Sequence, residues 1–219
     1  GQILNDVLVE VTQAVQAQVV DSQSPDLATG FAKLFSAVRS HVEPDKAHKA
    51  EQALFKGGYL TAFLECELAQ CAADISRPTE DASETDRAIY ALRRLSLSRC
   101  LAASGRRDEA LKTAQEATNL YRTLAKHNPA AYTPELATSL NNLANSQAEN
   151  GQRHEALKTA QEAVSISRNL AEHNPTAYNP KLAISLDNLA LRLAEDGQRG
   201  KALEAAQEAT DHYHNLARE

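Results

Sequence analysis

This chain lacks several features that would assign it to a function class. No apolar run approaches the length of about 18 residues that a membrane-spanning helix needs, and no cationic segment with an apolar core opens the chain as a secretory signal would. The 23 lysine and arginine residues, against 29 aspartate and glutamate residues, are scattered and form no block. This argues against binding to nucleic acid or to an anionic membrane. We therefore expect a cytoplasmic protein with neither partner.

Methionine and tryptophan are absent, and the chain begins with Gly1, so we expect it to be a piece of a longer protein. Cysteine is scarce. Cys66, Cys71 and Cys100 are odd in number, and the first two lie five positions apart, which places them on different faces of a helix. Neither a local disulfide nor metal chelation fits that spacing. We interpret the three as small buried hydrophobic residues in a reducing compartment.

The motifs of enzymatic chemistry are also absent. The sequence has no glycine-rich phosphate loop, no His-Glu-x-x-His pair and no nucleophile in a glycine-flanked turn. His127 and His173 lie near predicted helix ends, where a cation interacts favourably with the helix dipole, which favours capping over catalysis. His212 and His214 lie two positions apart and so face different directions on a helix. We predict a protein that is not an enzyme and holds no cofactor and no metal.

What the chain does contain is internal repetition. The nine residues at 109–117, Glu-Ala-Leu-Lys-Thr-Ala-Gln-Glu-Ala, recur identically at 155–163, and a looser copy follows at 201–209. The offset is 46 residues each time. A fixed period of this size is typical of stacked-repeat proteins, in which each unit buries its apolar face against its neighbours. Such proteins mostly act through the extended surface that they offer to a partner.

Helix signals follow the same period. Thr133-Pro134 and Asn179-Pro180 each offer an N-cap followed by proline at the first helical position, and the helix then runs to a turn glycine, Gly151 or Gly197. A second helix runs from the turn to His-Asn-Pro, where asparagine tolerates the left-handed conformation and proline prevents continuation. Small residues spaced by four and three form one stripe along the second helix: Ala110, Ala114, Ala117, then Ala156, Ala160, Ala163, then Ala202, Ala206 and Ala209.

This unit resembles the tetratricopeptide repeat. Leu143-Ala144 stands where that family has Leu-Gly, Gly151 stands at its turn, and Ala156 stands at the small position of its second helix. The period is longer than the usual one, and Leu-Asn-Asn-Leu-Ala at 140–144 and Leu-Asp-Asn-Leu-Ala at 186–190 resemble the kinesin-light-chain subclass. Similar long repeats occur in bacterial and fungal signalling proteins.

The resemblance implies an all-α fold, a right-handed superhelical solenoid of antiparallel helix pairs. We expect about ten helices. Three repeats of about 46 residues would occupy 76–219, and a degenerate repeat with its turn at Gly57-Gly58 would occupy 44–75. Residues 1–43 would form an N-terminal helical pair that serves as a cap or as a dimer contact.

A periodic series of polar residues marks the candidate binding surface. Ser96, Asn142 and Asn188 lie 46 residues apart, each directly before a first-helix leucine, a position that in the resembled family points into a concave groove. Asparagine donates and accepts hydrogen bonds at once, so it matches the backbone of an extended peptide. With their neighbours these residues make up the predicted peptide-binding set: Ser96, Arg99, Asn141, Asn142, Asn145, Asp187 and Asn188.

Two functions of different classes remain open on the sequence. The first is a scaffold module that grips a protein or peptide segment, including a segment of a neighbouring domain of the same chain, through the asparagines of the groove. The second is a structural spacer or homo-oligomerisation arm of a larger signalling protein, with an empty groove and a homodimer contact through residues 2–20. In that case the polar series would solvate an empty face or bond between neighbouring repeats.

Overall fold

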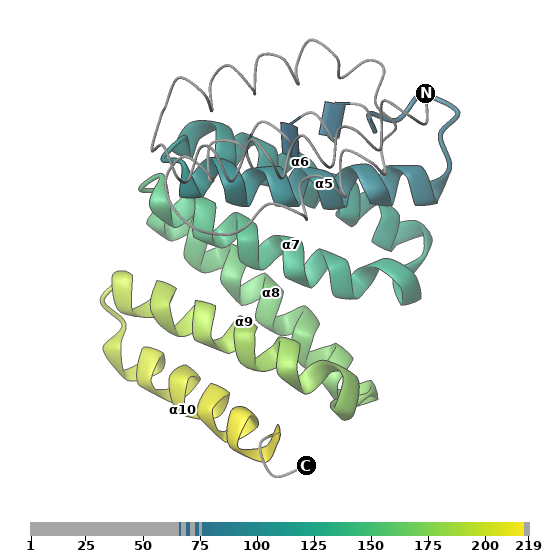
Figure 1. The fold of residues 1–219 in the computed structure, drawn as a ribbon. Coiled ribbons are helices and arrows are strands. Elements are labelled where there is room, and N and C mark those ends of the chain that lie inside the picture. Colours follow the sequence, from purple (N-terminus) through teal and green to yellow (C-terminus); the bar gives the residue numbers. More distant parts are fainter. Residues whose placement is uncertain (1–65, 67–68, 71–72, 75, 217–219) are drawn as a thin grey trace, which may run out of the picture. The chain divides into compact units, whose positions relative to one another are not determined.

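The computed structural model describes residues 66, 69–70, 73–74 and 76–216, and in this part of the chain the regular structure is helical (Figure 1). Six helices are defined there, where the sequence analysis expects about ten over the whole chain. The expected helices at 2–20 and from about 25 to 41, and most of the degenerate repeat, lie outside the described residues. The six are α5 (Glu84–Ala103), α6 (Arg107–His127), α7 (Pro129–Glu149), α8 (Arg153–His173), α9 (Pro175–Glu195) and α10 (Arg199–Leu216).

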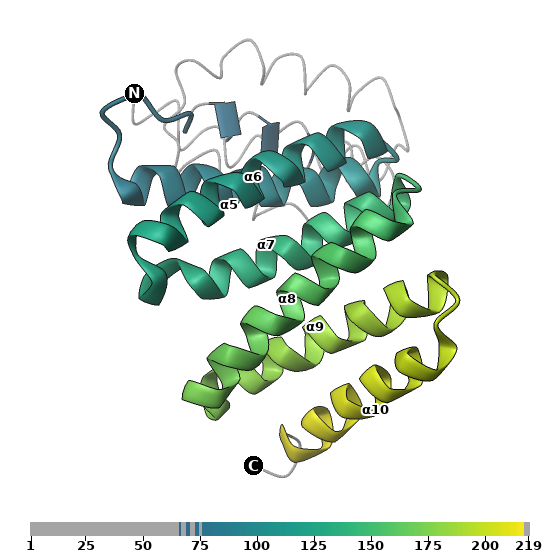
Figure 2. The same cartoon turned by 180° about the vertical axis from the view of Figure 1, so that it is seen from behind.

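The chain divides into two compact units, Gly1–Thr113 and Ala114–Glu219, and the division falls inside α6. In the second unit each helix from α7 to α10 packs on the next one in the chain, and α7 also contacts α9. Figure 2 shows these four helices from behind. The superhelical path expected from the family resemblance stays a prediction.

The turn inside each helix pair depends on a glycine. Gly105, Gly151 and Gly197 have φ angles of 78°, 80° and 80°, a left-handed conformation that glycine adopts without steric cost. After α7 the amide of Gln152 donates to the carbonyl of Gln147 over 2.8 Å, and the amide of Gly151 donates to that of Ala148 over 2.9 Å. These two bonds satisfy the last helical carbonyls in a Schellman motif. The prediction that Gly151 and Gly197 end the first helix of a pair is confirmed.

The connection between pairs is shorter than the sequence analysis expects. Asn128 and Asn174 have φ angles of −137° and −147°, so neither takes the predicted left-handed conformation. Each is instead the N-cap of the next helix, because its Oδ1 accepts a hydrogen bond from the backbone amide three residues later over 3.3 Å. Pro129 and Pro175 then occupy the first turn, where a proline costs no hydrogen bond.

The predicted helix starts at Thr133-Pro134 and Asn179-Pro180 are therefore wrong. Both prolines lie inside a helix that has already begun. Pro134 lacks the N–H that would bond to the carbonyl of Ala130. Ala130 is an exposed residue of the first turn, so water can take the missing place. Pro129 and Pro134 both fit a helix start. The helix begins at Pro129 because Asn128, directly before it, is the N-cap.

Small residues pack the second helix of each pair against its neighbours. Ala156, Ala160 and Ala163 of α8 have no exposed surface, and their counterparts in α6 are at most 1% exposed. In α10 the equivalent residue Ala206 is half-buried. Two clusters of buried side chains in the second unit are Val164, Ala171, Leu182, Leu186 and Ala209, and then Leu157, Leu193, Ala202 and Ala205.

The first unit has a core of its own. Cys66, Ala69 and Ala73 pack with Leu97, Leu101 and Ala110. Cys66 is buried, Cys100 is half-buried and neither is in a disulfide, in keeping with the interpretation as small hydrophobic residues. Cys71 lies outside the described residues.

Ala160→Trp should destabilise the chain by about 1–3 kcal/mol or more, because Ala160 is fully buried and the added ring has no space to enter. Lys158→Trp, at an exposed position of the same helix, is the control and should change little. Thermal melting measures both. Equal melting temperatures for Ala160→Trp and the parent would show that the alanine stripe is not a packed seam.

Tyr121 of α6 gives the fold a dependence on high pH. Burial raises the pKa of Tyr121 to about 12, with smaller contributions from Glu135 and Tyr132. Between about pH 10 and 12 the Tyr121 hydroxyl therefore keeps its proton in the folded chain and loses it in the unfolded chain. The contribution of Tyr121 to the free energy of unfolding is fully present below pH 10 and is lost between about pH 10 and 12. The free energy of unfolding should fall there by about 1.4 kcal/mol per pH unit more than in Tyr121→Phe. Denaturant titrations that give parallel pH profiles for the two chains would contradict this.

Candidate functional site

Five of the seven predicted site residues belong to a longer stripe on the first helix of each pair. Residues separated by four and then three positions lie on one face of a helix. We call this set the first-helix stripe, and its members recur every 46 residues. They are Leu92, Ser96 and Arg99 on α5, Thr138, Asn142 and Asn145 on α7, and Ile184, Asn188 and Leu191 on α9.

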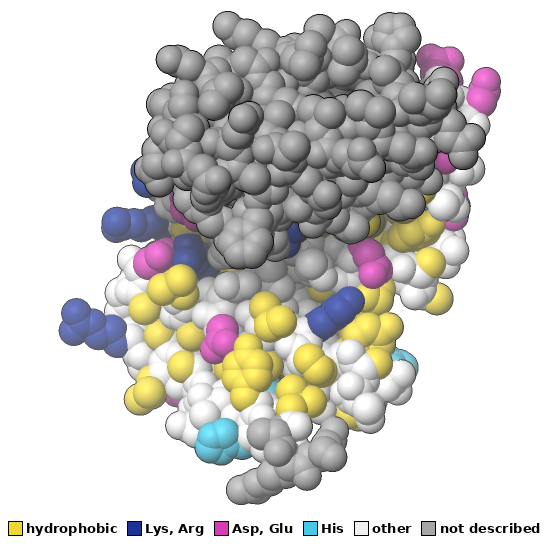
Figure 3. All heavy atoms as spheres, viewed as in Figure 1, with side chains coloured by type: hydrophobic (Ala, Val, Ile, Leu, Met, Phe, Trp, Pro, Cys, Tyr) yellow, Lys and Arg dark blue, Asp and Glu magenta, His cyan; other side chains and the backbone are white. Residues whose placement is uncertain are grey.

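The stripe carries exposed aliphatic side chains that the sequence analysis missed. Ile184 and Leu191 of α9 are 51% and 52% exposed, and Leu92 of α5 is 53% exposed. Figure 3 shows hydrophobic side chains gathered over the region of α9, with few charged ones among them. A single exposed leucine is ordinary, but aliphatic residues on both sides of Asn188 along one helix face are the usual composition of a contact surface. Extending the 46-residue period to every position of the stripe would have found them.

The amides of the stripe in the second unit are available to a partner. Asn142, Asn145 and Asn188 are half-buried, and no hydrogen bond of their side chains is found within the described part of the chain. Because α7 and α9 contact each other, these amides lie on neighbouring helices. Ser96 is half-buried and Arg99 is exposed on α5, which belongs to the other unit.

Asn141 has a different position from Asn142. It is 8% exposed, and its Nδ2 donates a hydrogen bond to Oγ of Ser185 over 2.8 Å. The same hydroxyl lies 2.9 Å from Oγ of Ser167 and donates to the carbonyl of Lys181 over 3.0 Å. Asn141 thus bonds one repeat to the next through α7, α8 and α9. The sequence analysis left open that polar residues of the series bond between neighbouring repeats, and Asn141 does so. Asn142 is the next residue, and a rotation of 100° about the helix axis points its side chain in another direction.

Asp187 is the counterpart of Asn141 one repeat later, and it is exposed. Its Oδ2 accepts a hydrogen bond from the hydroxyl of Tyr213 over 2.9 Å. Burial and then this bond to Asp187 raise the pKa of the Tyr213 phenol.

The second helices carry a ladder of ion pairs. Arg122 pairs with Glu162 over 2.8 Å, and Arg168 pairs with Glu208 over 2.7 Å, each joining successive second helices. All four side chains are well exposed, so each pair contributes little to stability. A shallow open pocket beside Arg168 has Val164 and Leu189 among its lining residues.

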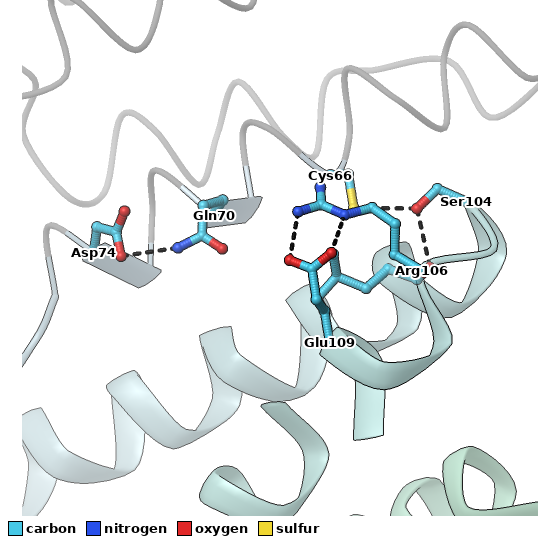
Figure 4. Close-up of polar contacts among 7 residues, drawn as sticks. Cys66, Gln70, Asp74, Ser104, Arg106 and Glu109 are labelled. Atoms are coloured by element: carbon cyan, nitrogen blue, oxygen red, sulfur yellow. Dashed lines mark hydrogen bonds and ion pairs between the residues drawn. The ribbon is translucent and has the colours of Figure 1, made fainter. Parts of the chain in front are cut away.

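Polar contacts also gather at the α5–α6 turn of the first unit, shown in Figure 4. The Oγ of Ser104 donates to the carbonyl of Leu101 over 3.0 Å and lies 3.7 Å from the thiol of Cys66. Arg106 makes two hydrogen bonds to Glu109, and they lower the pKa of that carboxyl. Since these groups are bonded to one another around a turn, they serve to hold the turn.

Within the described ranges, no helix is long and apolar enough to span a membrane. In the same ranges, no group of three or more His, Cys, Asp or Glu side chains is arranged to hold a metal ion. The expectations about cofactors, metals and enzyme activity stay predictions.

These features define a helical-hairpin repeat with an amide and aliphatic stripe on its first helices. Residues 136–175 match the family model of the tetratricopeptide repeat, so this segment of α7 and α8 is such a repeat. A sequence search among curated proteins finds no match.

Solved structures show the same fold. A kinesin light chain candidate from Podosopora anserina, crystallised as nearly identical TPR-like repeats, is 18% identical, covers 98% of this chain and 97% of its own, and has a TM-score of 0.60; a variant of it gives 0.62. Aspartyl phosphate phosphatase F from Bacillus subtilis is 13% identical with a TM-score of 0.59, and the match covers 98% of this chain and 52% of that one. The resemblance to kinesin-light-chain-like tetratricopeptide repeats is thus confirmed.

Ser185→Ala should destabilise the chain by about 1–3 kcal/mol, because it leaves the buried amide of Asn141 without its partner. Thr138→Ala is the control, since Thr138 is exposed and bonds only to the carbonyl of Pro134 within its own helix. Chemical denaturation measures both. If the two variants lose the same small amount, the bond between repeats contributes nothing to stability.

Proposed function

We propose that the chain is a binding module and that the part of its first-helix stripe on α7 and α9 holds an extended protein or peptide segment. Repeats of this fold generally mediate contacts between proteins. The observation that carries the proposal is the pairing of chemistries on α9, where the half-buried Asn188 lies between the exposed Ile184 and Leu191. Such a surface combines a polar group for a peptide backbone with apolar area for the side chains of the ligand.

The amides would supply the grip on the backbone. An asparagine side chain offers two N–H donors and one carbonyl acceptor, so Asn142 and Asn188 together can pair with the C=O and N–H groups of an extended segment. This pairing does not depend on the identity of the ligand's side chains. Asn145 extends the polar part of the stripe on α7, and Arg99 gives the α5 part of the stripe a positive charge.

The aliphatic members would supply selectivity. Leucine and isoleucine that are half exposed in the free protein lose their remaining contact with water when an apolar ligand side chain covers them, at about 25 cal/mol for each Å² buried. We therefore expect a preferred ligand to be an extended segment with aliphatic or aromatic side chains facing α9. Asn141 is not assigned to this contact, because it is buried and its Nδ2 already donates to Ser185.

Asn142→Ala together with Asn188→Ala should weaken ligand binding at least tenfold, because each lost backbone pair costs on the order of 1 kcal/mol or more once it is desolvated. The probes are 12-residue peptides selected against the chain from a random-sequence phage library. Their affinities for parent and variant are measured by fluorescence anisotropy. Melting curves of both chains should agree.

Asn119→Ala, at an exposed position of α6, is the matched control and should bind as the parent does. Leu191→Ser should weaken binding of the apolar peptides further. Unchanged affinity in the double asparagine variant would remove these amides from the binding account. A library that yields no binder at all would favour the spacer or oligomerisation arm.

A further inference from the structure

The second helices form the rims of two grooves that are built in the same way. Arg122 of α6 pairs with Glu162 of α8, and Arg168 of α8 pairs with Glu208 of α10, so one ion pair bridges each groove. We call them the α6–α8 groove and the α8–α10 groove. Their residues lie one repeat apart in the sequence, so the two grooves can be compared position by position.

The α8–α10 groove contains the pocket beside Arg168. Its volume is about 440 Å³, a size typical of ligand pockets, and Val164 of α8 and Leu189 of α9 give it an apolar floor. In the α6–α8 groove the counterpart of Val164 is Thr118, which is fully buried and whose Oγ1 donates to backbone carbonyls. The valine in the floor therefore distinguishes the α8–α10 groove from the earlier one.

The two grooves also carry opposite charge. One turn after the arginine stands Lys126 in the first groove and Glu172 in the second. One turn before the glutamate stands Lys158 in the first groove and Glu204 in the second. All four side chains are exposed, and no ion pair of theirs is found within residues 76–216. With the bridging pairs included, three cations face one anion in the α6–α8 groove, and three anions face one cation in the α8–α10 groove.

Glu172 and Glu204 are the charges that a ligand of the α8–α10 groove can reach. The Nη2 of Arg168 donates to both carboxylate oxygens of Glu208 over 2.7 and 2.9 Å, so these two charges balance each other. Glu172 lines the pocket, and Glu204 stands on the opposite rim. Carboxylates beside an apolar floor suit lysine and arginine, whose aliphatic stems cover apolar surface while the charged heads reach the carboxylates.

The bridging ion pair sets the spacing between the two carboxylates. Glu172 lies four residues after Arg168, and Glu204 lies four residues before Glu208. Because α8 and α10 are second helices of successive pairs and run in the same direction, the two carboxylates are offset along the groove by about 12 Å. An extended segment rises about 3.3 Å per residue, so residues four positions apart span that offset and point to the same side. Lys201, three residues before Glu204, ends the acidic stretch on α10.

We infer that the α8–α10 groove binds an extended basic segment of a partner protein, through two lysine or arginine residues four positions apart that reach Glu172 and Glu204. Their aliphatic stems lie over Val164 and Leu189. The net charge of −6 on the chain favours the approach of such a partner. This groove is separate from the first-helix stripe and does not depend on the function proposed for it.

The probe is a nine-residue peptide of glycine and serine with lysine at positions 3 and 7 and both ends blocked. It is titrated at low ionic strength, where screening is weak, and at pH 8, where histidine is ordinarily neutral. The methyl NMR signals of Val164 and Leu189 should shift, and the same peptide with glutamate in place of lysine should leave them in place. Glu172→Lys together with Glu204→Lys gives the groove the residues of the preceding repeat. It should weaken binding at least tenfold without changing the melting curve.

Glu149→Lys together with Glu155→Lys is the matched control. It makes the same change in net charge at exposed positions outside the α8–α10 groove and should bind the lysine peptide nearly as the parent does. Equal losses in the two double variants would overturn the proposal, because the peptide would then follow net charge alone. The absence of shifts at Val164 and Leu189 would also overturn it. So would self-association of the parent in light scattering that Glu172→Lys with Glu204→Lys abolishes, because the occupant would then be a second copy.

Discussion

The close approach of helices across an alanine seam is the constraint on which the rest of this structure depends. Aromatic residues make up 5% of the chain, so its core is built from small side chains and leucine. Ala156, Ala160 and Ala163 leave no exposed surface because the neighbouring helices lie directly against them. Such packing tolerates little added volume. It also fixes the rotation of each helix about its axis, and that rotation decides which residues are left outside.

The stripe on the first helices is a consequence of that rotation. With Leu140 and Leu186 turned into the core, Asn142 and Asn188 come to the outer side of α7 and α9. The seam thereby gives successive first helices a polar group at the same position of the repeat. The stripe residues on either side of the central asparagine differ between repeats. They are polar on α7 and aliphatic on α9. In the proposed function, both repeats would bind the ligand backbone through the asparagine at this position, while the ligand side chains that each repeat prefers would differ.

The sequence predicts the repeat architecture well because the same signals occur at a period of 46. Turn glycines, the alanine stripe and the leucine positions agree with one another in three copies. It fails where two local signals compete. Pro129 and Pro134 both suit a helix start, and the side-chain bond from Asn128 to the first turn decides the matter only in three dimensions. Likewise Asn141 and Asn142 are the same residue type at adjacent positions. Only the position of Ser185 in the folded chain shows that Asn141 bonds one repeat to the next. Ile184 and Leu191 lie 46 residues after Thr138 and Asn145, so the period locates them on the stripe, and the folded chain adds that they are exposed.

The most direct test of the binding account is methyl NMR of the chain with a selected peptide. Isoleucine, leucine and valine methyl groups report separately on the two sides of the helix pairs. The account predicts that the methyl signals of Ile184 and Leu191 shift on titration, while those of Val164 and Leu157, buried on the other faces, stay in place. Shifts confined to Val164 and Leu189 would place the ligand in the pocket beside Arg168, which α8 forms with Leu189 of α9, and would contradict the account.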